Sequence, residues 1–271
     1  MAAVVVEHLG GALTRISRAA FNCYVVHDAG QGRALVIDPG TPNNGADAAA
    51  VVRTKLGASG RATVICTHGH VDHVGGVPQA CAVADGYHLP AICEQYLAGS
   101  IVPAAPGPRE IAKILPVLMS QPFSFAALRE LVPLQKTMGH QRTGMTMPTP
   151  PAGFVADGDT VPGAPSWRVI SAPGHTGDAT CFYDASTATL FGGDSVLVHA
   201  GQAWFNPEIT DAGASAHTEG QLRSLPVEHL FPGHGLPVSG TDLLGRARSF
   251  RDRPPGGAVS CRLARLVGAW G

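Results

Sequence analysis

The sequence feature that most constrains this chain is the run His68-Gly69-His70-Val71-Asp72-His73, which places three imidazoles and a carboxylate within six consecutive positions. Residues 62–67 before it are short, apolar and often β-branched, which predicts a buried strand that ends at the run. In an extended chain residues i and i+2 point to the same side, so His68 and His70 can share one metal ion. Asp72 and His73 follow where the chain turns, and can face a second ion.

Three further candidate ligands, His175, Asp194 and His234, come much later in the chain. Each follows an apolar run and stands beside glycine, where a side chain lies at a strand end and another backbone can come close. A solvated polar loop would explain the first cluster alone, but it leaves these three similar positions unexplained. All seven side chains offer N or O donors and none offers a thiolate, a set that suits Zn, Fe or Mn.

On these residues the chain resembles the metallo-β-lactamase superfamily, whose HxHxDH motif and later ligands occur in the same order over nearly the whole chain. The resemblance implies an α/β fold, a four-layer αββα sandwich, and two divalent metal ions, with Zn expected first and Fe or Mn as alternatives. One ion would be held by His68, His70 and His175, and the other by Asp72, His73 and His234. Asp194 would bridge the two ions.

An aspartate at the bridging position is similar to glyoxalase II, lactonases and related hydrolases. True β-lactamases usually carry cysteine or serine there, which argues against antibiotic hydrolysis. Asp38, at the end of the predicted strand 33–38, resembles a family carboxylate near the metal histidines. As an outer acceptor it would fix the tautomer and orientation of a ligand; its alternative role is that of a turn former.

The bulk composition excludes several classes of protein. A net charge of −1 gives no electrostatic footprint for nucleic acid or an anionic membrane. No apolar run approaches the length of a membrane span, and no signal peptide is recognised, so a cytoplasmic protein is the default expectation. The six cysteines form no CxxC pair and most stand in apolar stretches, which predicts buried free thiols.

With 271 residues and 45% hydrophobic content, we expect a single domain over 1–271, because ligands from both halves must meet. The patterns predict the following elements: strands at 4–8, 13–17, 21–27, 33–38, 62–67, 167–171, 179–183, 187–191 and 227–231, and helices at 43–56, 77–84, 212–225 and 242–250. Asn44 or Asp47 is expected near the start of the first helix, and Gly57 after its end.

Residues 99–151 are predicted to be an insertion with two short amphipathic runs, 110–118 and 126–134, and an end rich in Met, Gly and Pro. It is either a lid over the metal cleft that receives an apolar substrate group, or a packing elaboration or homodimer contact. His140 is the one further histidine that such a lid could bring near a leaving group. The arginines after 245 would meet a phosphate-bearing carrier such as coenzyme A or, more simply, form a solvated helix face.

The function predicted from these residues is hydrolysis of an acyl bond in a small-molecule or carrier-linked thioester, ester or lactone, by attack of a metal-bound hydroxide. Asp72 and Asp194 are the expected catalytic carboxylates, and no serine or cysteine nucleophile is required. The alternative is a mononuclear-iron oxygenase similar to the superfamily's persulfide dioxygenases, because the same ligands can bind iron. A metal-dependent binding protein without catalysis is the third reading, which the complete ligand set disfavours.

Overall fold

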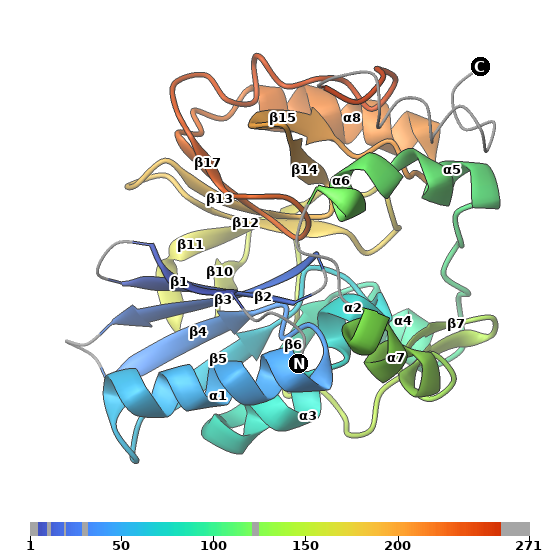
Figure 1. Cartoon of the computed structure of the whole chain (residues 1–271). Coiled ribbons are helices and arrows are strands. Elements are labelled where there is room, and N and C mark those ends of the chain that lie inside the picture. Colours follow the sequence, from blue (N-terminus) through green and yellow to red (C-terminus); the bar gives the residue numbers. More distant parts are fainter. Residues whose placement is uncertain (1–4, 10–11, 19, 29–31, 121–124, 256–271) are drawn as a thin grey trace.

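The computed structural model describes residues 5–9, 12–18, 20–28, 32–120 and 125–255. Two β-sheets lie face to face between layers of helices (Figure 1). The predicted αββα sandwich is therefore confirmed. Among the described residues, no helix is long and apolar enough to cross a membrane.

The first sheet has seven strands, which lie in the order β1-β2-β3-β4-β5-β6-β9. Their bounds are β1 Val5–His8, β2 Leu13–Arg18, β3 Phe21–Asp28, β4 Arg33–Ile37, β5 Arg61–Ile65, β6 Ala84–Pro90 and β9 Gly153–Val155. The first four strands form an antiparallel meander, whereas β5, β6 and β9 run parallel to β4. Helices α1 (Pro42–Leu56) and α3 (Val77–Ala80) cover its outer face (Figure 1).

The second sheet has six strands in the order β10-β11-β12-β13-β16-β17. Their bounds are β10 Thr160–Val161, β11 Ala164–Ser171, β12 Thr180–Asp184, β13 Thr189–Gly193, β16 His229–Pro232 and β17 Val238–Ser239. Strands β13 and β16 run parallel, so the loops after them leave the same edge of the sheet. Helix α8 (Ala212–Arg223) lies on its outer side, with the hairpin β14 (Val196–His199) and β15 (Gln202–Phe205) beside it (Figure 1).

Alternation along the strands divides the core into three apolar layers. On β4, Ala34 and Val36 pack toward α1, while Leu35 and Ile37 pack between the sheets, as a period of two requires. Phe182 and Phe191 of the second sheet complete this middle layer. The third layer lies between the second sheet and α8, where Leu222 and Leu230 are fully buried.

Residues 99–151 contain short helices and a hairpin. They are α5 (Pro108–Lys113), α6 (Leu115–Met119), α7 (Phe125–Leu134), β7 (Gly139–Gln141) and β8 (Gly144–Thr146). Helix α6 contributes Ile114 and Val117 at its start to a cluster with Leu197 and Trp204 of β14 and β15, whereas α7 packs Leu131 against Phe21 of β3. The segment thus contacts both halves of the sandwich, and Figure 1 shows α5 and α6 apart from α7.

Two predicted helices differ in the structure. The helix expected at 77–84 ends at Ala80, passes into a 3₁₀ turn at Cys81–Val83 and gives way to β6, which sequence reasoning missed along with β14 and β15. The helix expected at 242–250 is wrong, because this segment forms turns. Its backbone pairs with β15 through Arg248, and Arg223 of α8 donates to the carbonyls of Leu244, Gly245 and Ala247, which a helix would have used internally.

Two smaller expectations have clear outcomes. Thr41 is the N-cap of α1, in place of Asn44 or Asp47, and its hydroxyl accepts from the backbone of Asn44. The cysteines at 23, 66, 81, 93 and 181 are free, and all but Cys81 are fully buried, as predicted. Cys261, Arg262 and Arg265 lie outside the described residues.

Candidate metal centre

The HxHxDH motif follows β5 and ends in a single turn of helix. His68 and His70 stand in the loop after the strand, and His70 is the N-cap of α2 (Val71–Val74), with an extended backbone. Asp72 and His73 lie within α2, so they leave the loop in a different direction. The chain can turn away directly after α2 because Gly76 approaches another loop so closely that a Cβ there would lie 2.3 Å from the carbonyl oxygen of Pro39.

The second half of the chain brings three side chains to the same place. His175 follows β11, Asp194 follows β13 and His234 follows β16, each at the end of its strand. Oδ2 of Asp194 lies 3.6 Å from Nε2 of His175 and 3.1 Å from Nε2 of His234, and its Oδ1 lies 3.4 Å from Nε2 of His73. Nε2 of His175 also lies 3.2 Å from Nδ1 of His70.

All seven sequence-predicted side chains therefore meet, and they form three overlapping groups with the spacing of metal ligands. The groups are His68 with His70 and His175, His68 with His73 and Asp194, and Asp72 with His73 and His234. The first and third are the two triads expected from the sequence. Asp194 lies between them, because its two oxygens face different histidines.

The orientation of the rings fits metal binding. Nδ1 of His73 lies 2.9 Å from the carboxylate of Asp38, and Nδ1 of His175 and His234 lie 2.7 Å from the carbonyl oxygens of Glu208 and Ala20. A ring that donates through Nδ1 keeps an unprotonated Nε2, which is the form that binds a metal. Among the described residues, Nε2 of His68 and His73 and Oδ1 of Asp194 are buried without a hydrogen-bond partner. Divalent cations would satisfy these atoms.

Burial and charge set the protonation of the cluster. Burial and the neighbouring imidazoles lower the pKa of His68, and they lower the pKa of His70 to about 3, so both rings are neutral. Burial acts against charging His234, but the carboxylates of Asp194 and Asp72 raise its pKa to about 10. In the protein without metal, the two carboxylates therefore keep His234 protonated, and a bound cation would displace that proton.

Asp38 occupies the position expected of an outer carboxylate. Its Oδ1 accepts from the backbone N–H of Thr67 at 2.7 Å, and its Oδ2 accepts from the Thr67 hydroxyl at 2.8 Å and contacts His73. Its backbone has φ of 50°, in the left-handed region that Asp and Asn tolerate better than most residues. The sequence expectation that Asp38 orients a histidine is confirmed.

Sequence reasoning missed Asp178, which connects three segments around the motif. Its Oδ2 accepts from the backbone N–H of Gly69 at 2.7 Å, lies 3.0 Å from Nε2 of His140 and 3.3 Å from Sγ of Cys93. The backbone N–H of His140 also donates to the carbonyl of Gly69 at 2.9 Å. The signal that could have found it is an acidic side chain three residues after His175.

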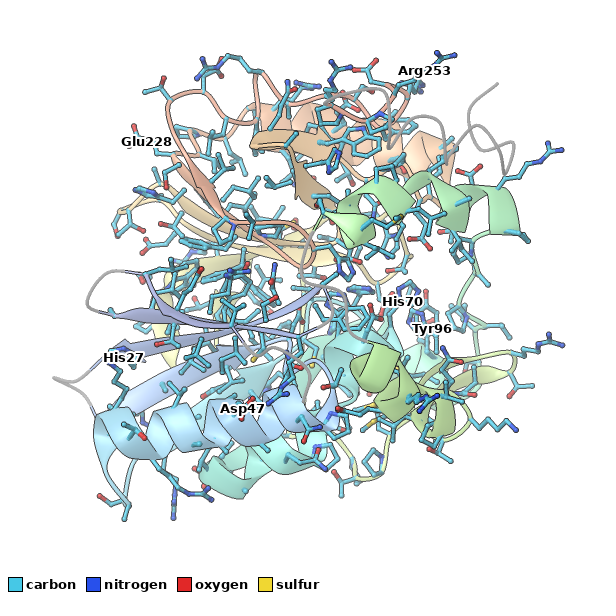
Figure 2. The ribbon with its side chains drawn as sticks, viewed as in Figure 1. His27, Asp47, His70, Tyr96, Glu228 and Arg253 are labelled. Atoms are coloured by element: carbon cyan, nitrogen blue, oxygen red, sulfur yellow. The ribbon has the colours of Figure 1, made fainter. Side chains whose placement is uncertain are left out.

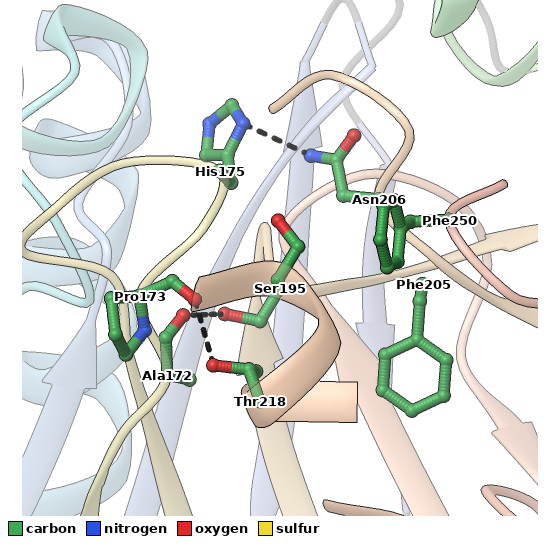
Figure 3. Close-up of a pocket in the computed structure, with 9 residues that line it drawn as sticks. Ala172, Pro173, His175, Ser195, Phe205, Asn206, Thr218 and Phe250 are labelled. Carbon is green, nitrogen blue, oxygen red and sulfur yellow. Dashed lines mark hydrogen bonds between the residues drawn. The ribbon is translucent and has the colours of Figure 1, made fainter. Parts of the chain in front are cut away.

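Asn206 was also missed, and it supports the ligands of the second half. Its amide nitrogen donates to the carbonyl of Asp194 at 2.8 Å and lies 3.2 Å from Nδ1 of His175. Figure 3 shows this contact beside a small cavity of about 10 Å³ behind His175. Asn206 follows an apolar strand without any ligand spacing, so no sequence pattern distinguishes it.

A cleft of about 430 Å³ opens onto the cluster, and His70 and Asp72 are among the residues that line it. Most of its wall comes from the 99–151 segment: Pro103, Ala104, Ala105, Pro106, Ile111, Gln135, His140, Gln141 and Arg142. Val71 and Glu208 complete the lining. His140 packs edge-on between His70 and Tyr96, two residues near the junction of the halves in Figure 2. His140, the histidine that the sequence suggested a lid could bring near a leaving group, therefore lies beside the cluster.

Comparisons with known proteins agree with this geometry. Residues 20–234 match the metallo-beta-lactamase superfamily. The probable metallo-hydrolase YflN of Bacillus subtilis (strain 168) is 24% identical over 223 residues, which cover 76% of each chain. An uncharacterized protein of Aquifex aeolicus (strain VF5) is 26% identical over 189 residues, which cover 69% of this chain and 71% of that one.

Solved structures show the same fold at low sequence identity. VMB-1 superposes with a TM-score of 0.56 at 13% identity and covers 99% of each chain. The BLEG-1 B3 metallo-beta-lactamase superposes with a TM-score of 0.54 at 18% identity, over 86% of this chain and 95% of that one. With a family match that spans most of the sequence and a sandwich that carries the motif at its strand ends, this chain belongs to the metallo-beta-lactamase superfamily.

Proposed function

We propose that the protein is a dinuclear-metal hydrolase that cleaves an acyl bond in a thioester, ester or lactone. The observation that carries the proposal is the pair of triads with Asp194 between them. His68, His70 and His175 would hold one ion, and Asp72, His73 and His234 the other. Zn is the expected metal, and the N and O donors also suit Fe or Mn.

Bound divalent metals would supply a water with a pKa lowered from about 16 toward 7 and would polarise a substrate carbonyl. The two carboxylates of the site, Asp194 and Asp72, would have different roles. Asp194 is 3% exposed and lies among the rings, which suits a bridging position. The Asp72 side chain is 21% exposed and lines the cleft, so it can accept a hydrogen bond from the attacking water and orient it.

The aspartate at position 194 also supports a thioester, ester or lactone substrate over a β-lactam antibiotic. By resemblance it is similar to the bridging residue of glyoxalase II and lactonases, where true β-lactamases usually have cysteine or serine. A thiolate or an activated alkoxide leaves without a strong general acid. Among the described residues that line the cleft, His140 could be considered as such an acid, but its Nε2 already contacts Asp178. This favours thioesters, activated esters and lactones over amides.

The 99–151 segment suits the role of a lid or wall that receives an apolar acyl group. It contributes Pro103 and Pro106 and the side chain of Ile111, which is 46% exposed beside the cleft. Its deletion should spare metal binding and alter the preference for acyl chain length. An unchanged preference would remove this role and leave a packing or dimer contact.

The test begins with the metal content of the purified protein, measured by inductively coupled plasma mass spectrometry without added metal. About two zinc ions per chain, with hydrolysis of a thioester and lactone panel that a chelator abolishes, would support the proposal. About one iron per chain with oxygen uptake on persulfides would replace it by the oxygenase alternative. An unaltered cellular role in Asp194→Ala despite lost metal chemistry would favour the metal-dependent binding protein.

A further inference from the structure

Glu208 is a buried carboxylate for which the proposed hydrolysis has no use. It is 6% exposed, yet it lines the cleft with His70 and Asp72. Among the described residues, its side chain has no hydrogen bond or ion pair. Its backbone carbonyl oxygen lies 2.7 Å from Nδ1 of His175, so the residue lies close to the candidate metal centre. The carboxylate reaches the cleft, where its oxygens are available to accept a hydrogen bond from a bound ligand.

The backbone holds Glu208 in a fixed position. Its N–H donates to Oδ1 of Asn206 at 2.8 Å, and its carbonyl accepts from Nδ1 of His175 at 2.7 Å. Two residues later, the N–H of Thr210 donates to the carbonyl of Gly174 at 2.7 Å. The backbone that carries the carboxylate is therefore fixed on both sides of Glu208, by Asn206 and by the loop of His175, and a fixed backbone helps to place a binding group accurately.

We propose that Glu208 is a specificity residue that accepts a hydrogen bond from a hydroxyl or N–H group near the scissile carbonyl of the substrate. The inference rests on the proposed acyl hydrolysis and narrows its substrate class to acyl groups that carry such a donor, for example hydroxyacyl thioesters. A carboxylate acceptor rejects an analogue that lacks the donor, because the acceptor then loses its hydration without gaining a partner.

The same geometry excludes a second class of substrate. Asp72 and Glu208 are two carboxylates that line one cleft. An acyl group with its own carboxylate near the scissile bond would meet like charges there. The cation that lines the cleft, Arg142, is exposed on the turn of the β7–β8 hairpin. Succinyl-type acyl groups should therefore be poor substrates, and removal of the Glu208 charge should improve them.

The experiment compares matched thioesters of N-acetylcysteamine: butyryl, 2-hydroxybutyryl, 3-hydroxybutyryl and succinyl. The variants are Glu208→Leu, which keeps volume but removes the acceptor, and Glu208→Gln, which keeps an acceptor oxygen without charge. Glu228→Leu is the control, because Glu228 is exposed and lies far from the cleft (Figure 2). Metal content and melting temperature of each variant show that the centre and the fold are intact.

We expect the wild type to favour a hydroxybutyryl over the butyryl thioester by about tenfold or more in kcat/KM, since a hydrogen bond to a charged group has at least this effect. Glu208→Leu should abolish that ratio, Glu208→Gln should retain part of it, and both should improve the succinyl substrate relative to butyryl. An unchanged ratio in Glu208→Leu, or a uniform loss on all four substrates, would overturn the inference.

A binding measurement separates this inference from the proposed function. If the wild type hydrolyses no thioester, the proposed function fails, and thermal shifts of the zinc-loaded protein with butyrate and 3-hydroxybutyrate decide the inference alone. A larger shift with 3-hydroxybutyrate that disappears in Glu208→Leu would support a donor-binding carboxylate. Equal shifts in wild type and variant would refute it.

Discussion

Replacing Asp38 by asparagine should weaken the centre without disturbing the fold. Asparagine has the same shape, and it tolerates the left-handed backbone at this position, where φ is 50°. Its oxygen can still accept from the N–H of Thr67, as Oδ1 of Asp38 does at 2.7 Å. Its NH₂ group then replaces the oxygen that lies 2.9 Å from Nδ1 of His73.

This exchange reverses the tautomer of His73. Nδ1 must now accept a hydrogen bond, so the proton moves to Nε2, which faces Asp194 at 3.4 Å and is the atom available to a metal. Metal binding would have to displace that proton. Loss of an outer partner of this kind costs 10- to 100-fold in affinity as an order of magnitude, or about 1.4 to 2.7 kcal/mol.

The measurement is a competition titration of zinc against a chelating dye, with metal content after dialysis as a second readout. We expect the wild type to retain about two ions and Asp38→Asn to retain one tightly, because only the site of His73 is affected. Asp47→Asn is the matched control, since Asp47 pairs with Arg18 on α1 and β2, away from the cluster. Equal zinc affinities in wild type and Asp38→Asn would refute the reasoning.

Three further outcomes are expected. Gly69→Ala should destabilise the protein by about 2 kcal/mol in urea unfolding, because its Cβ would lie 2.6 Å from Nε2 of His140 and break the contact with Asp178; equal midpoints would contradict this. Gly220→Ala, with open space at mid-helix in α8, should stabilise by about 0.5–1 kcal/mol, and a lower midpoint would refute it. Chelation should lower the melting temperature, because metal at a free concentration near 1,000 Kd adds about 4 kcal/mol to the free energy of unfolding. Scanning calorimetry with and without chelator measures the shift, and equal melting temperatures would contradict this prediction.

The ligand set was predictable because its residues carry their own signals. His68, His70 and His73 are crowded into one loop after an apolar strand, and His175 and His234 recur in similar contexts. Parallel strands β13 and β16 then bring Asp194 and His234 to one edge, which any sheet of this order would do. Strands of the first half were also predictable, because β3, β4 and β5 are short segments rich in apolar and β-branched residues.

Two outer partners, Asp178 and Asn206, were not predicted from local patterns. Asp178 contacts Gly69, which lies 109 residues earlier in the chain, and Asn206 contacts the loop of Asp194, so their partners come from other segments. The expected helix at 242–250 failed for a related reason. Arg223, from another helix, captures its carbonyls, and a tertiary contact of this kind overrides local propensity.

The loop that carries His234 is held by one of the first strands of the chain. The amide of Asn22 on β3 donates to the carbonyls of Pro232 and Gly235, and the hydroxyl of Tyr24 donates to Pro232 at 2.7 Å. A growing chain therefore cannot assemble its metal centre until residue 235 has left the ribosome. Nascent chains stalled before and after this residue should therefore differ in metal content.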